Sequence, residues 1–382
     1  MNYRNIRGIQ MKQNVIEKVP RNSGIELLKV IAMILIAISH AVPVYGDYKA
    51  ISFVNIDVCT ADFSVIIMAM FRYLGTIGND IFIVSSAWFL IESNKIRKEK
   101  VINIIFNSFV ISVTILIILK ALGIDIPKAD FKSAFTPIMM NLNWFVTCYL
   151  VLYLIHPLLN MTIEKMQQKE LLKLNIIFFM AYVILSIYKS SIFFRTALLE
   201  MIIIYYNVAY IKLYRKKFCN DSKSNLYYLI IGIAALISEI LLMNGIGLHA
   251  TNGKLYLTKF NGMINPLICM IAITAFNIFR NINLKNKIVN YISSLSILFY
   301  MIHENLLLAN YVRPKFYQKF FVYGYRVGWV LIEAVLLIAF GITFAMIYKE
   351  SIGKITNILS VKTKEIIEKV YNKIEKKIIK LN

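Results

Sequence analysis

The stretch Ser23–His40 reads SGIELLKVIAMILIAISH, an apolar run of membrane-spanning length that is interrupted by Glu26, Lys29 and His40. Charge inside a membrane helix is costly, so an ionisable residue there indicates function. Lys29 and His40 are eleven residues apart, which at about 100° per residue places them on one helix face, roughly 16 Å apart along the axis. The stretch therefore predicts a first membrane helix with a cation near one end of this face and an imidazole near the other. Glu26 precedes Lys29 by three residues and is expected to form an ion pair with it.

The composition extends this interpretation to the whole chain. Of its 382 residues, 58% are hydrophobic and 17% are charged, with a mean hydropathy of +0.64, whereas a soluble domain carries about 25% charged residues. Apolar runs of about 20 residues, long enough to cross a bilayer, recur along nearly the whole sequence. We expect an all-α polytopic membrane helix bundle, because a β-barrel would show short segments of alternating polarity.

About ten transmembrane helices are expected from these runs: 24–43, 64–91, 101–120, 143–160, 172–189, 195–211, 226–246, 262–279, 291–310 and 327–348. The second run is too long for one straight span. Gly75 and Gly78 are expected to break it into an interfacial piece, Phe63–Leu74, and a span, Asn79–Ile91.

The chain divides into an N-terminal tail (residues 1–22), a transmembrane domain (23–348) and a basic C-terminal tail (349–382). An even number of spans places both termini on one side of the membrane. The basic clusters Lys95–Lys100 and Lys212–Lys217 assign that side to the cytoplasm. In the C-terminal tail, apolar residues recur at helical spacing among lysines, which is typical of a basic amphipathic helix on the inner leaflet; a solvated basic tail is the alternative.

The net charge of +22 is explained by basic residues that lie between the apolar runs and contact anionic lipid. We therefore expect membrane lipid, and no nucleic acid, as a partner. A composition rich in lysine, isoleucine and asparagine is typical of a bacterial AT-rich genome, which favours a bacterial cell membrane as the location. The cysteines have no metal-ligand spacing and are expected to be free thiols, with no metal site: Cys59, Cys148, Cys219 and Cys269.

His40 is the first candidate for chemistry. A neutral imidazole takes a proton from an attacking hydroxyl or carries an acyl group itself; a packing histidine is the alternative. Asp80 lies near the outer face, at the expected depth of His40, and is a candidate to orient its imidazole by a hydrogen bond. His303, beside Glu304 in the ninth span, is a candidate to tune an imidazole or bind a hydroxyl, although neighbouring side chains on a helix point about 100° apart; a packing hydrogen bond is the alternative. His156 is expected to be interfacial.

Four blocks of sequence resemble, in order, those of the acyltransferase 3 family of integral-membrane acyltransferases. The first helix of that family carries a basic residue, ten further residues and then a histidine, and Lys29 and His40 fit this spacing, with lysine in place of the more usual arginine. The other three blocks are Gly78–Leu90, which resembles the second-helix block with Ser86 in place of glycine, Asn143–Leu150, which resembles a W-F-L-x-x-L block, and Ser296–Glu304, which resembles a Y-L-x-H block.

The resemblance implies a function. In this family acyl-CoA is held on the cytoplasmic side, and its acyl group is passed across the membrane, often to a sugar hydroxyl of a cell-surface glycan. The histidine that matches His40 is held to be essential there, and a cytoplasmic Arg-x-x-Arg element helps binding or catalysis. Arg97–Lys100 matches that element only as Arg-x-x-Lys, so the bidentate phosphate contact of an arginine would be lost at Lys100.

The phosphates of CoA need basic partners, and the expected ones are Lys29, Arg97, Lys98 and Lys100. The last three are equally explained as determinants of topology. The resemblance thus predicts an acyltransferase that moves an acyl group, most simply acetyl from acetyl-CoA, to a hydroxyl of a polysaccharide, a lipid-linked sugar or a related glycan. The expected catalytic residues are His40, Lys29, Asp80 and His303.

The alternative is a multi-pass exporter of a glycan or small metabolite, with His40, Glu239 and Glu333 as relay groups. A transporter predicts broken helices in two related halves and charged residues along a continuous path. The sequence shows one charged stripe and no clear halves, which favours the enzyme.

Overall fold

The computed structural model describes residues 21–43, 63–140, 142–187, 197–250, 260–320 and 325–379, and within these ranges all regular structure is helical. The expected all-α architecture is confirmed, while the predicted N-terminal tail lies almost entirely outside the described residues. The helices are α1 (Ser23–His40), α2 (Phe63–Leu90), α3 (Lys98–Ala121), α4 (Lys128–Phe135), α5 (Trp144–Lys165), α6 (Gln168–Ile187), α7 (Ala197–Tyr214), α8 (Lys216–Asn220), α9 (Ser222–Ala250), α10 (Pro266–Arg280), α11 (Lys287–Ser293), α12 (Ser296–His303), α13 (Leu306–Tyr311), α14 (Arg313–Phe320), α15 (Arg326–Glu350) and α16 (Ile352–Ile379).

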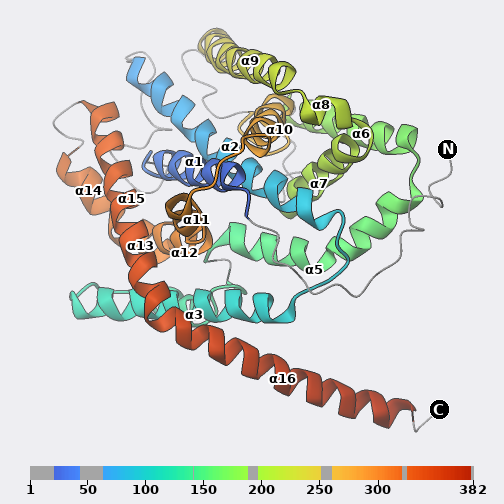
Figure 1. The fold of residues 1–382 in the computed structure, drawn as a ribbon. Helices are drawn as coiled ribbons and strands as arrows, with labels where there is room; N and C mark the ends of the chain where they lie inside the picture. The colour runs from blue at the N-terminus through green and yellow to red at the C-terminus, as the bar shows by residue number, and fades with distance from the viewer. Residues whose placement is uncertain are drawn as a thin grey trace.

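The helix α1 lies in the middle of the bundle, in contact with α2, α10, α11, α12 and α15 (Figure 1). Its start is fixed by Asn22, whose side chain accepts hydrogen bonds from the backbone N–H groups of Gly24 at 2.9 Å and Ile25 at 3.3 Å. Such an N-cap satisfies donors that have no partner inside the helix. The Asn22 amide also donates to the carbonyl of Arg280 at 2.8 Å, which joins the start of α1 to the end of α10.

Gly75 and Gly78 do not break α2, which runs without interruption over 28 residues. The prediction of an interfacial piece and a separate span is therefore wrong. Both glycines lie against α1: a Cβ atom on Gly75 would lie 2.4 Å from Ser39 Oγ, and one on Gly78 would lie 2.6 Å from Ile36 Cγ1. The two glycines allow close approach of two helix backbones, the usual role of small residues between membrane helices.

Gly78→Ala is expected to lower the free energy of unfolding by about 1–3 kcal/mol, because the new methyl group would overlap Ile36 and the carbonyl of Ala32, 2.8 Å away. Gly328→Ala on α15 is the matched control. No described residue has an atom within 4 Å of a Cβ atom there, so the stability of this variant should be unchanged or slightly higher. Thermal unfolding in detergent, followed by circular dichroism, measures both. Equal stability of Gly78→Ala and the wild type would contradict the close approach of α1 and α2.

Seven of the described helices are long and apolar enough to cross a membrane: α1, α2, α3, α5, α7, α9 and α15. The bent segment Lys287–Tyr311 adds an eighth if it is one span. The count of about ten is not confirmed. The expected eighth span corresponds to α10, whose 15 residues extend only about 22 Å, less than the roughly 30 Å of the hydrocarbon core.

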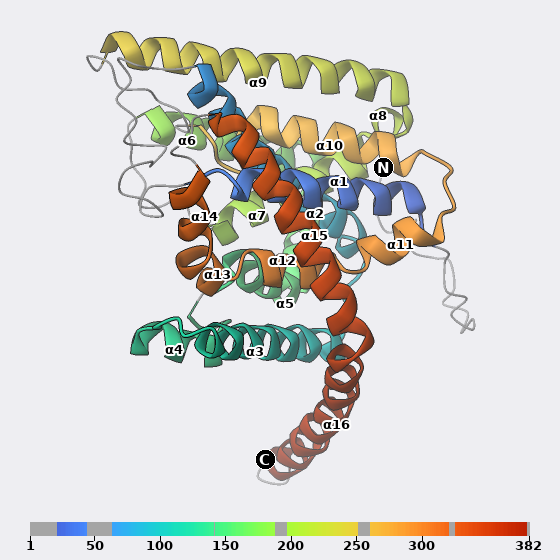
Figure 2. The ribbon, with the colours of Figure 1, turned by 90° about the vertical axis from the view of Figure 1, so that its left-hand side faces the viewer.

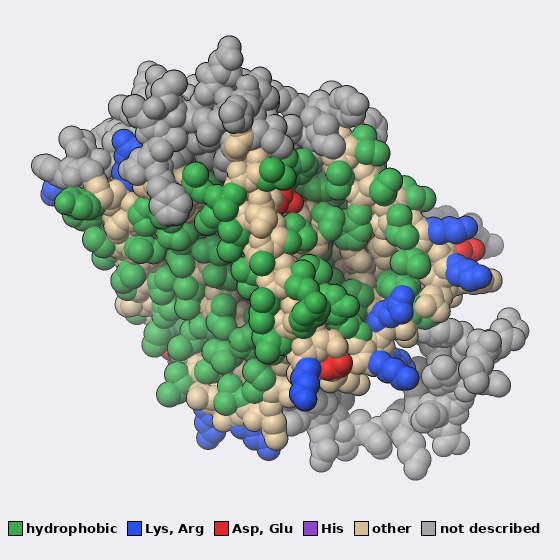
Figure 3. Space-filling model, turned by 90° about the horizontal axis from the view of Figure 1, so that it is seen from above, with side chains coloured by type: hydrophobic (Ala, Val, Ile, Leu, Met, Phe, Trp, Pro, Cys, Tyr) green, Lys and Arg blue, Asp and Glu red, His purple; other side chains and the backbone are tan. Residues whose placement is uncertain are grey.

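The surface agrees with a multi-pass membrane protein. The face seen in Figure 3 is covered by hydrophobic side chains, and lysine and arginine gather at its margins. This face lies on the side of α9 in Figure 1, and many large apolar side chains of α9 are exposed: Leu226, Tyr227, Ile230, Ile233, Ile237 and Leu242. An apolar belt between charged margins is the surface that a bilayer covers.

The ninth expected span is a series of short helices rather than one rod. The chain bends by 42° between α11 and α12, and a second break at Glu304 and Asn305 separates α12 from α13. Irregular backbone at membrane depth is tolerated where it is buried in protein or lines a cavity. This second break is where His303 and Glu304 lie.

The helix α16 continues from α15, packs across α3 and projects from the bundle (Figures 1 and 2). Part of its buried face is polar: the Thr356 hydroxyl donates to Asn107 Oδ1 of α3 at 2.8 Å. Two ion pairs join it to the start of α3: Lys98–Glu368 at 3.6 Å and Lys364–Glu99 at 3.5 Å. Its exposed surface carries an apolar stripe: Ile355, Ile358, Leu359, Ile366, Ile367, Val370 and Ile374.

Candidate active site

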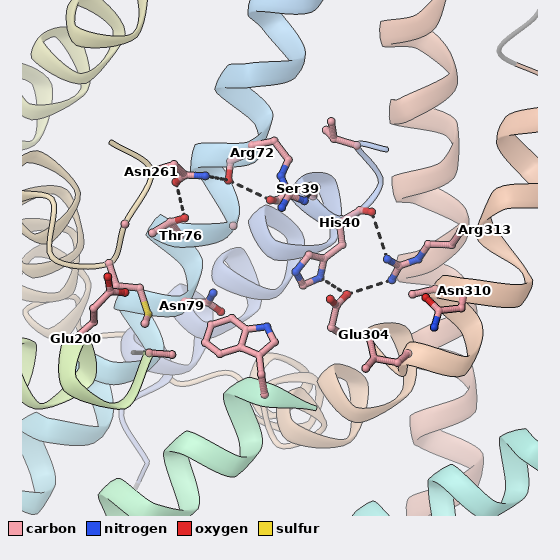
Figure 4. A pocket seen from close by; sticks show the side chains of 18 residues that line it. Ser39, His40, Arg72, Thr76, Asn79, Glu200, Asn261, Glu304, Asn310 and Arg313 are labelled. Atoms are coloured by element: carbon pink, nitrogen blue, oxygen red, sulfur yellow. Dashed lines mark hydrogen bonds and ion pairs between the residues drawn. The ribbon is translucent and has the colours of Figure 1, made fainter. Parts of the chain in front are cut away.

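The break after α12 places two side chains against the end of α1. His40 Nδ1 lies 2.9 Å from Glu304 Oε2 and 3.0 Å from His303 Nε2. His303 is fully buried, while the side chains of His40 and Glu304 are 11% and 15% exposed. Figure 4 shows Glu304 between His40 and Arg313, at the edge of a cavity. The site therefore joins the last residue of α1 to a helix break far along the chain.

Hydrogen-bond partners decide which nitrogen of each ring carries the proton. His303 Nδ1 lies 2.8 Å from the carbonyl of Phe299, which only accepts, so His303 carries its hydrogen on Nδ1 and presents the Nε2 lone pair to His40. The Glu304 carboxylate is a second acceptor at the same nitrogen of His40. Neutral His40 therefore carries its hydrogen on Nδ1, and its Nε2, on the other side of the ring, keeps the lone pair of a base.

Arg313 holds this arrangement together. Its guanidinium donates to Glu304 Oε2 at 3.2 Å and to the backbone carbonyl of His303, and it reaches the carbonyl of His40 at 3.5 Å. The Arg313 side chain is only 9% exposed. A guanidinium beside a buried carboxylate supplies the partner without which the carboxylate would be an unpaired charge. One arginine thus fixes the relative positions of all three members of the cluster.

A cavity of about 640 Å³, here called the His40 cavity, opens beside this cluster (Figure 4). Its wall combines one indole ring with many hydrogen-bonding groups: Trp144, Arg72, Thr76, Asn79, Glu200, Asn261, Glu304, Asn310 and Arg313. The volume is that of a small-molecule site. An aromatic face surrounded by amides, hydroxyls and charged groups suits a polar ligand that carries several hydroxyls.

Hydrogen bonds between three segments brace one side of the His40 cavity (Figure 4). Arg72 Nη1 donates to the carbonyl of Ser39 at 3.0 Å, and Ser39 Oγ donates to the carbonyl of Arg72 at 3.1 Å. Asn261 donates to the same carbonyl of Arg72 at 3.3 Å and accepts from Thr76 Oγ1 at 2.6 Å. This side of the cavity is therefore fixed by α1, α2 and the segment before α10.

A second cavity of about 250 Å³, the Lys29 cavity, lies toward the other end of α1 and is lined by Lys29 and Lys100 among others. Lys29 Nζ lies 3.5 Å from Glu26 Oε1, so the predicted ion pair is confirmed. Lys100 Nζ lies 3.3 Å from the hydroxyl of Tyr149 and 4.9 Å from the ring centroid of Tyr153. Two of the four cations predicted to bind CoA therefore line one cavity.

Aromatic side chains separate the two cavities. Trp144 and His40 line the His40 cavity, whereas Phe145 and Tyr300 line the Lys29 cavity. The Tyr300 ring centroid lies 5.2 Å from that of Phe145 and 6.2 Å from that of His40. The Tyr300 hydroxyl is buried and makes no hydrogen bond to the part of the chain that the structure describes. The rings of Trp144, Phe145 and Tyr300, here called the aromatic layer, therefore lie between the Lys29 cavity and the imidazole of His40.

Asp80 does not orient His40; Glu304 takes that position. Asp80 is fully buried, and its Oδ2 accepts from Cys269 Sγ at 3.6 Å. Its neighbour Asn79 lines the His40 cavity. Because successive helical residues point about 100° apart, the next side chain, Asp80, turns toward α10 instead.

Arg97 and Lys98 line neither cavity. The backbone N–H of Arg97 donates to the hydroxyl of Tyr153 at 3.1 Å, while the ammonium of Lys98 pairs with Glu368. His156 is fully buried, with Nδ1 2.6 Å from the carbonyl of Tyr153, and its interfacial depth stays a prediction. The three described cysteines, Cys148, Cys219 and Cys269, are free thiols, as predicted, and Cys59 lies outside the described residues.

Sequence reasoning missed Arg313 and Asn310, which face the site from the segment around α13 and α14. Nothing in the sequence distinguishes Arg313 from the other basic residues between apolar runs, apart from Pro314 after it. In the sequence, Glu304 is noted only as the neighbour of His303. A polar residue within a late apolar run is a signal for a site, but it does not say which distant helix that residue meets.

One potential metal-ligating atom from each of His40, His303 and Glu304 lies within 4.8 Å of the other two. The hydrogen on His40 Nδ1 already accounts for the convergence of two acceptors on that nitrogen. Arg313, 3.2 Å from the Glu304 carboxylate, also places a positive charge where a metal ion would add a second. The cluster is therefore best explained as a hydrogen-bonded base and its supports.

The helical bundle and its site define the class of protein: a multi-pass membrane protein with a partly buried histidine–carboxylate pair at the edge of one of two cavities. A family model described as an acyltransferase domain, Acyl_transf_3, matches residues 22–350 of the chain. The protein therefore belongs to the acyltransferase 3 family and is a membrane acyltransferase, as the resemblance predicted. A comparison with curated proteins gave no match, and a comparison with solved structures gave none either.

Proposed function

We propose that this protein transfers an acyl group, most simply acetyl, from cytoplasmic acyl-CoA to a hydroxyl group of a cell-surface polysaccharide or a related glycan. The observation that supports this proposal is the placement of two cavities against one aromatic layer. Lys29 and Lys100 line the cavity on one side of the layer, and His40, with a free lone pair, lines the cavity on the other. A donor with phosphates and an acceptor with a hydroxyl need these two environments.

In the proposed reaction the acceptor hydroxyl lies in the His40 cavity, and its oxygen attacks the carbonyl carbon of the thioester. The hydroxyl proton passes to His40 Nε2, the carbon–sulfur bond breaks, and the CoA thiolate then takes the proton from His40. Glu304 stabilises the imidazolium that forms, because its carboxylate contacts the opposite nitrogen at 2.9 Å. The same lone pair would carry the acyl group if transfer proceeds in two steps.

The Lys29 cavity is too small for a whole CoA molecule, and we assign it to the pyrophosphate and the adjoining part of the pantetheine arm, whose thioester end then points toward His40. Lys29 and Lys100 then meet the negative charge of the donor, while Arg97 and Lys98, outside the cavity, are available to its nucleotide end. The acyl group must pass the rings of Phe145 and Tyr300 to reach His40. The roughly 16 Å between Lys29 and His40 along α1 sets the length of this path.

Lys100→Gln is expected to weaken acetyl-CoA binding by about tenfold or more, because it removes a charge-assisted contact to phosphate. Lys120→Gln is the matched control, since it makes the same charge change at the other end of α3, where Lys120 pairs with Asp125 at 3.5 Å. Calorimetric titration of acetyl-CoA into purified protein in nanodiscs measures both affinities. Equal affinity for the two variants would confine Lys100 to a role in topology.

The residues that line the His40 cavity support a sugar as the acceptor. An indole face beside amides and hydroxyls is a common surface for sugar rings, and Trp144, Asn79 and Asn261 supply such groups. A polysaccharide, a lipid-linked sugar or a similar glycan meets these requirements. We place the protein in a bacterial cell membrane with both termini in the cytoplasm, which brings the Lys29 cavity to the side that holds acyl-CoA.

We further propose that α16 lies on the inner membrane surface. Its exposed apolar stripe is flanked by the exposed lysines Lys362, Lys369 and Lys373, the pattern of an interfacial amphipathic helix that binds anionic lipid. Through the Lys98–Glu368 pair it would also hold the start of α3, close to Lys100.

The geometry favours the enzyme over the transporter alternative, although one span is broken. It requires Glu239 and Glu333 on one path with His40, and neither glutamate lines the His40 cavity or the Lys29 cavity. Glu239 accepts a hydrogen bond from Asn265 at 3.0 Å. Glu333 is buried on α15.

A further inference from the structure

A groove outside both cavities lies between α6, α7, α8, α9 and α10, which are neighbours in Figure 1. It has two parts, of about 470 Å³ and about 190 Å³. The two parts share five lining residues: Phe179, Asn207, Ile211, Phe218 and Met270. They therefore form one continuous groove, which the acyl-transfer proposal does not use.

One end of the groove is basic and polar. Arg215 lines it directly after α7, with its guanidinium 3.1 Å from the hydroxyl of Tyr210 and 5.6 Å from that ring's centroid. This contact holds the guanidinium at the mouth of the groove. The next residues, Lys216 and Lys217, are exposed and add two positive charges. The mouth is therefore a place where an anionic group would be attracted and bound.

An unsatisfied acceptor lies in the same part of the groove. Asn175 of α6 is 4% exposed, and its amide donates to the carbonyl of Tyr206 at 3.4 Å. Its Oδ1 is buried and has no hydrogen-bond partner among the described residues. A buried acceptor without a partner costs free energy and calls for an explanation. A ligand with a hydroxyl or ammonium donor next to its anionic group would supply the missing hydrogen bond.

The other end of the groove is apolar. From the mouth it runs along Ile176 and Phe179 of α6 to Met270 and Ile273 of α10, and it ends near Pro266. α7 and α10 both end on the side of the basic mouth, at Tyr214 and Arg280, so the apolar end lies at membrane depth. An anionic head at one end and a hydrocarbon chain at the other describe a phospholipid.

We propose that this groove is a specific site for one anionic phospholipid whose headgroup donates a hydrogen bond, the class of phosphatidylglycerol. Its phosphate binds Arg215, its headgroup hydroxyl donates to Asn175 Oδ1, and one acyl chain lies along Phe179, Met270 and Ile273. Phosphatidylcholine lacks both the net negative charge and the donor and is excluded by the same contacts. The proposal does not depend on the acyl-transfer function.

The test is retention of lipid by the full-length protein, purified from micelles with equal amounts of phosphatidylglycerol and phosphatidylcholine and examined by native mass spectrometry. We expect about one phosphatidylglycerol per wild-type chain and no comparable retention of phosphatidylcholine. Arg215→Gln should lower this retention about tenfold or more, since one charge-assisted contact is lost. Met270→Trp should abolish it by filling the groove, and Met270→Leu, which keeps the volume, should not.

Lys223→Gln is the matched control for charge. Lys223 is exposed at the start of α9, on the same side as Arg215, and does not line the groove. Its replacement should leave lipid retention unchanged. Equal losses in Arg215→Gln and Lys223→Gln would reduce the effect to general attraction and overturn the proposal. Equal retention of the two lipids, or retention that Met270→Trp does not change, would also overturn it.

Discussion

His40→Ala is expected to reduce acyl transfer by roughly 10²–10⁴-fold, the range that a positioned general base contributes. Among the described residues, His40 is the only imidazole lining the His40 cavity, and its Nε2 is left with the lone pair by the hydrogen bonds at Nδ1. The measurement is the O-acetyl content of surface glycans in cells that carry the variant at normal protein level. Release of free CoA thiol from acetyl-CoA by protein in nanodiscs provides a second readout.

The control for this variant is His156→Asn. His156 is a second fully buried histidine, but it lies on α5 and lines neither cavity, so acyl transfer should persist. Unchanged glycan acetylation in His40→Ala would remove His40 from the chemistry.

A second experiment separates direct transfer from transfer in two steps through His40. The protein is exposed briefly to labelled acetyl-CoA without acceptor. Label on the wild-type chain and none on His40→Ala indicates a transient acyl-imidazole, and no label on either indicates direct transfer.

Glu304→Gln is expected to lower kcat by about 10²–10⁴-fold while leaving KM for acetyl-CoA nearly unchanged. The carboxylate sets the position of the hydrogen on His40 Nδ1 and balances the charge of the imidazolium, and loss of such a carboxylate costs up to about 10⁴ in comparable histidine–carboxylate sites. Glu304 acts through His40, so it is a positioning residue. The split between kcat and KM separates this role from substrate binding.

Glu304→Asp is the conservative companion. It keeps the charge that Arg313 and His40 contact but shortens the side chain, so it should recover part of the rate. A raised KM with unchanged kcat in Glu304→Gln would make Glu304 a substrate-binding residue instead. Equal losses in Glu304→Gln and Glu304→Asp, together with lowered thermal stability, would assign it to structure alone.

Some features of this protein followed from the sequence because they depend on local geometry. The placement of Lys29 and His40 on one face of a membrane helix needs only the helical repeat. The ion pair between Glu26 and Lys29 needs only their spacing, and the structure confirms it at 3.5 Å. The all-helical class follows from the length and composition of the apolar runs.

The two glycines of α2 have a role that local sequence rules do not predict. A pair of glycines in an apolar run predicts a break, and on that ground α2 was expected to divide at Gly75 and Gly78. In the bundle both positions face α1, where a side chain would overlap Ser39 or Ile36. Glycine fits both a helix break and a close approach of two helices, and only the position of the neighbouring helix α1 decides between these two explanations. The span count is not confirmed for a similar reason, since apolar length alone does not show that α10 is short or that α12 and α13 are separate.

The sequence by itself determined that the chain is a helical membrane protein and that its first helix carries a cation and an imidazole on one face. Only the tertiary structure decided what the imidazole meets: Glu304 rather than Asp80, with His303 at the same nitrogen and Arg313 behind both. His40 and His303 are 263 positions apart. The physical reason is that a helix fixes directions only along its own axis, whereas contacts between distant residues depend on how whole helices pack and where they break.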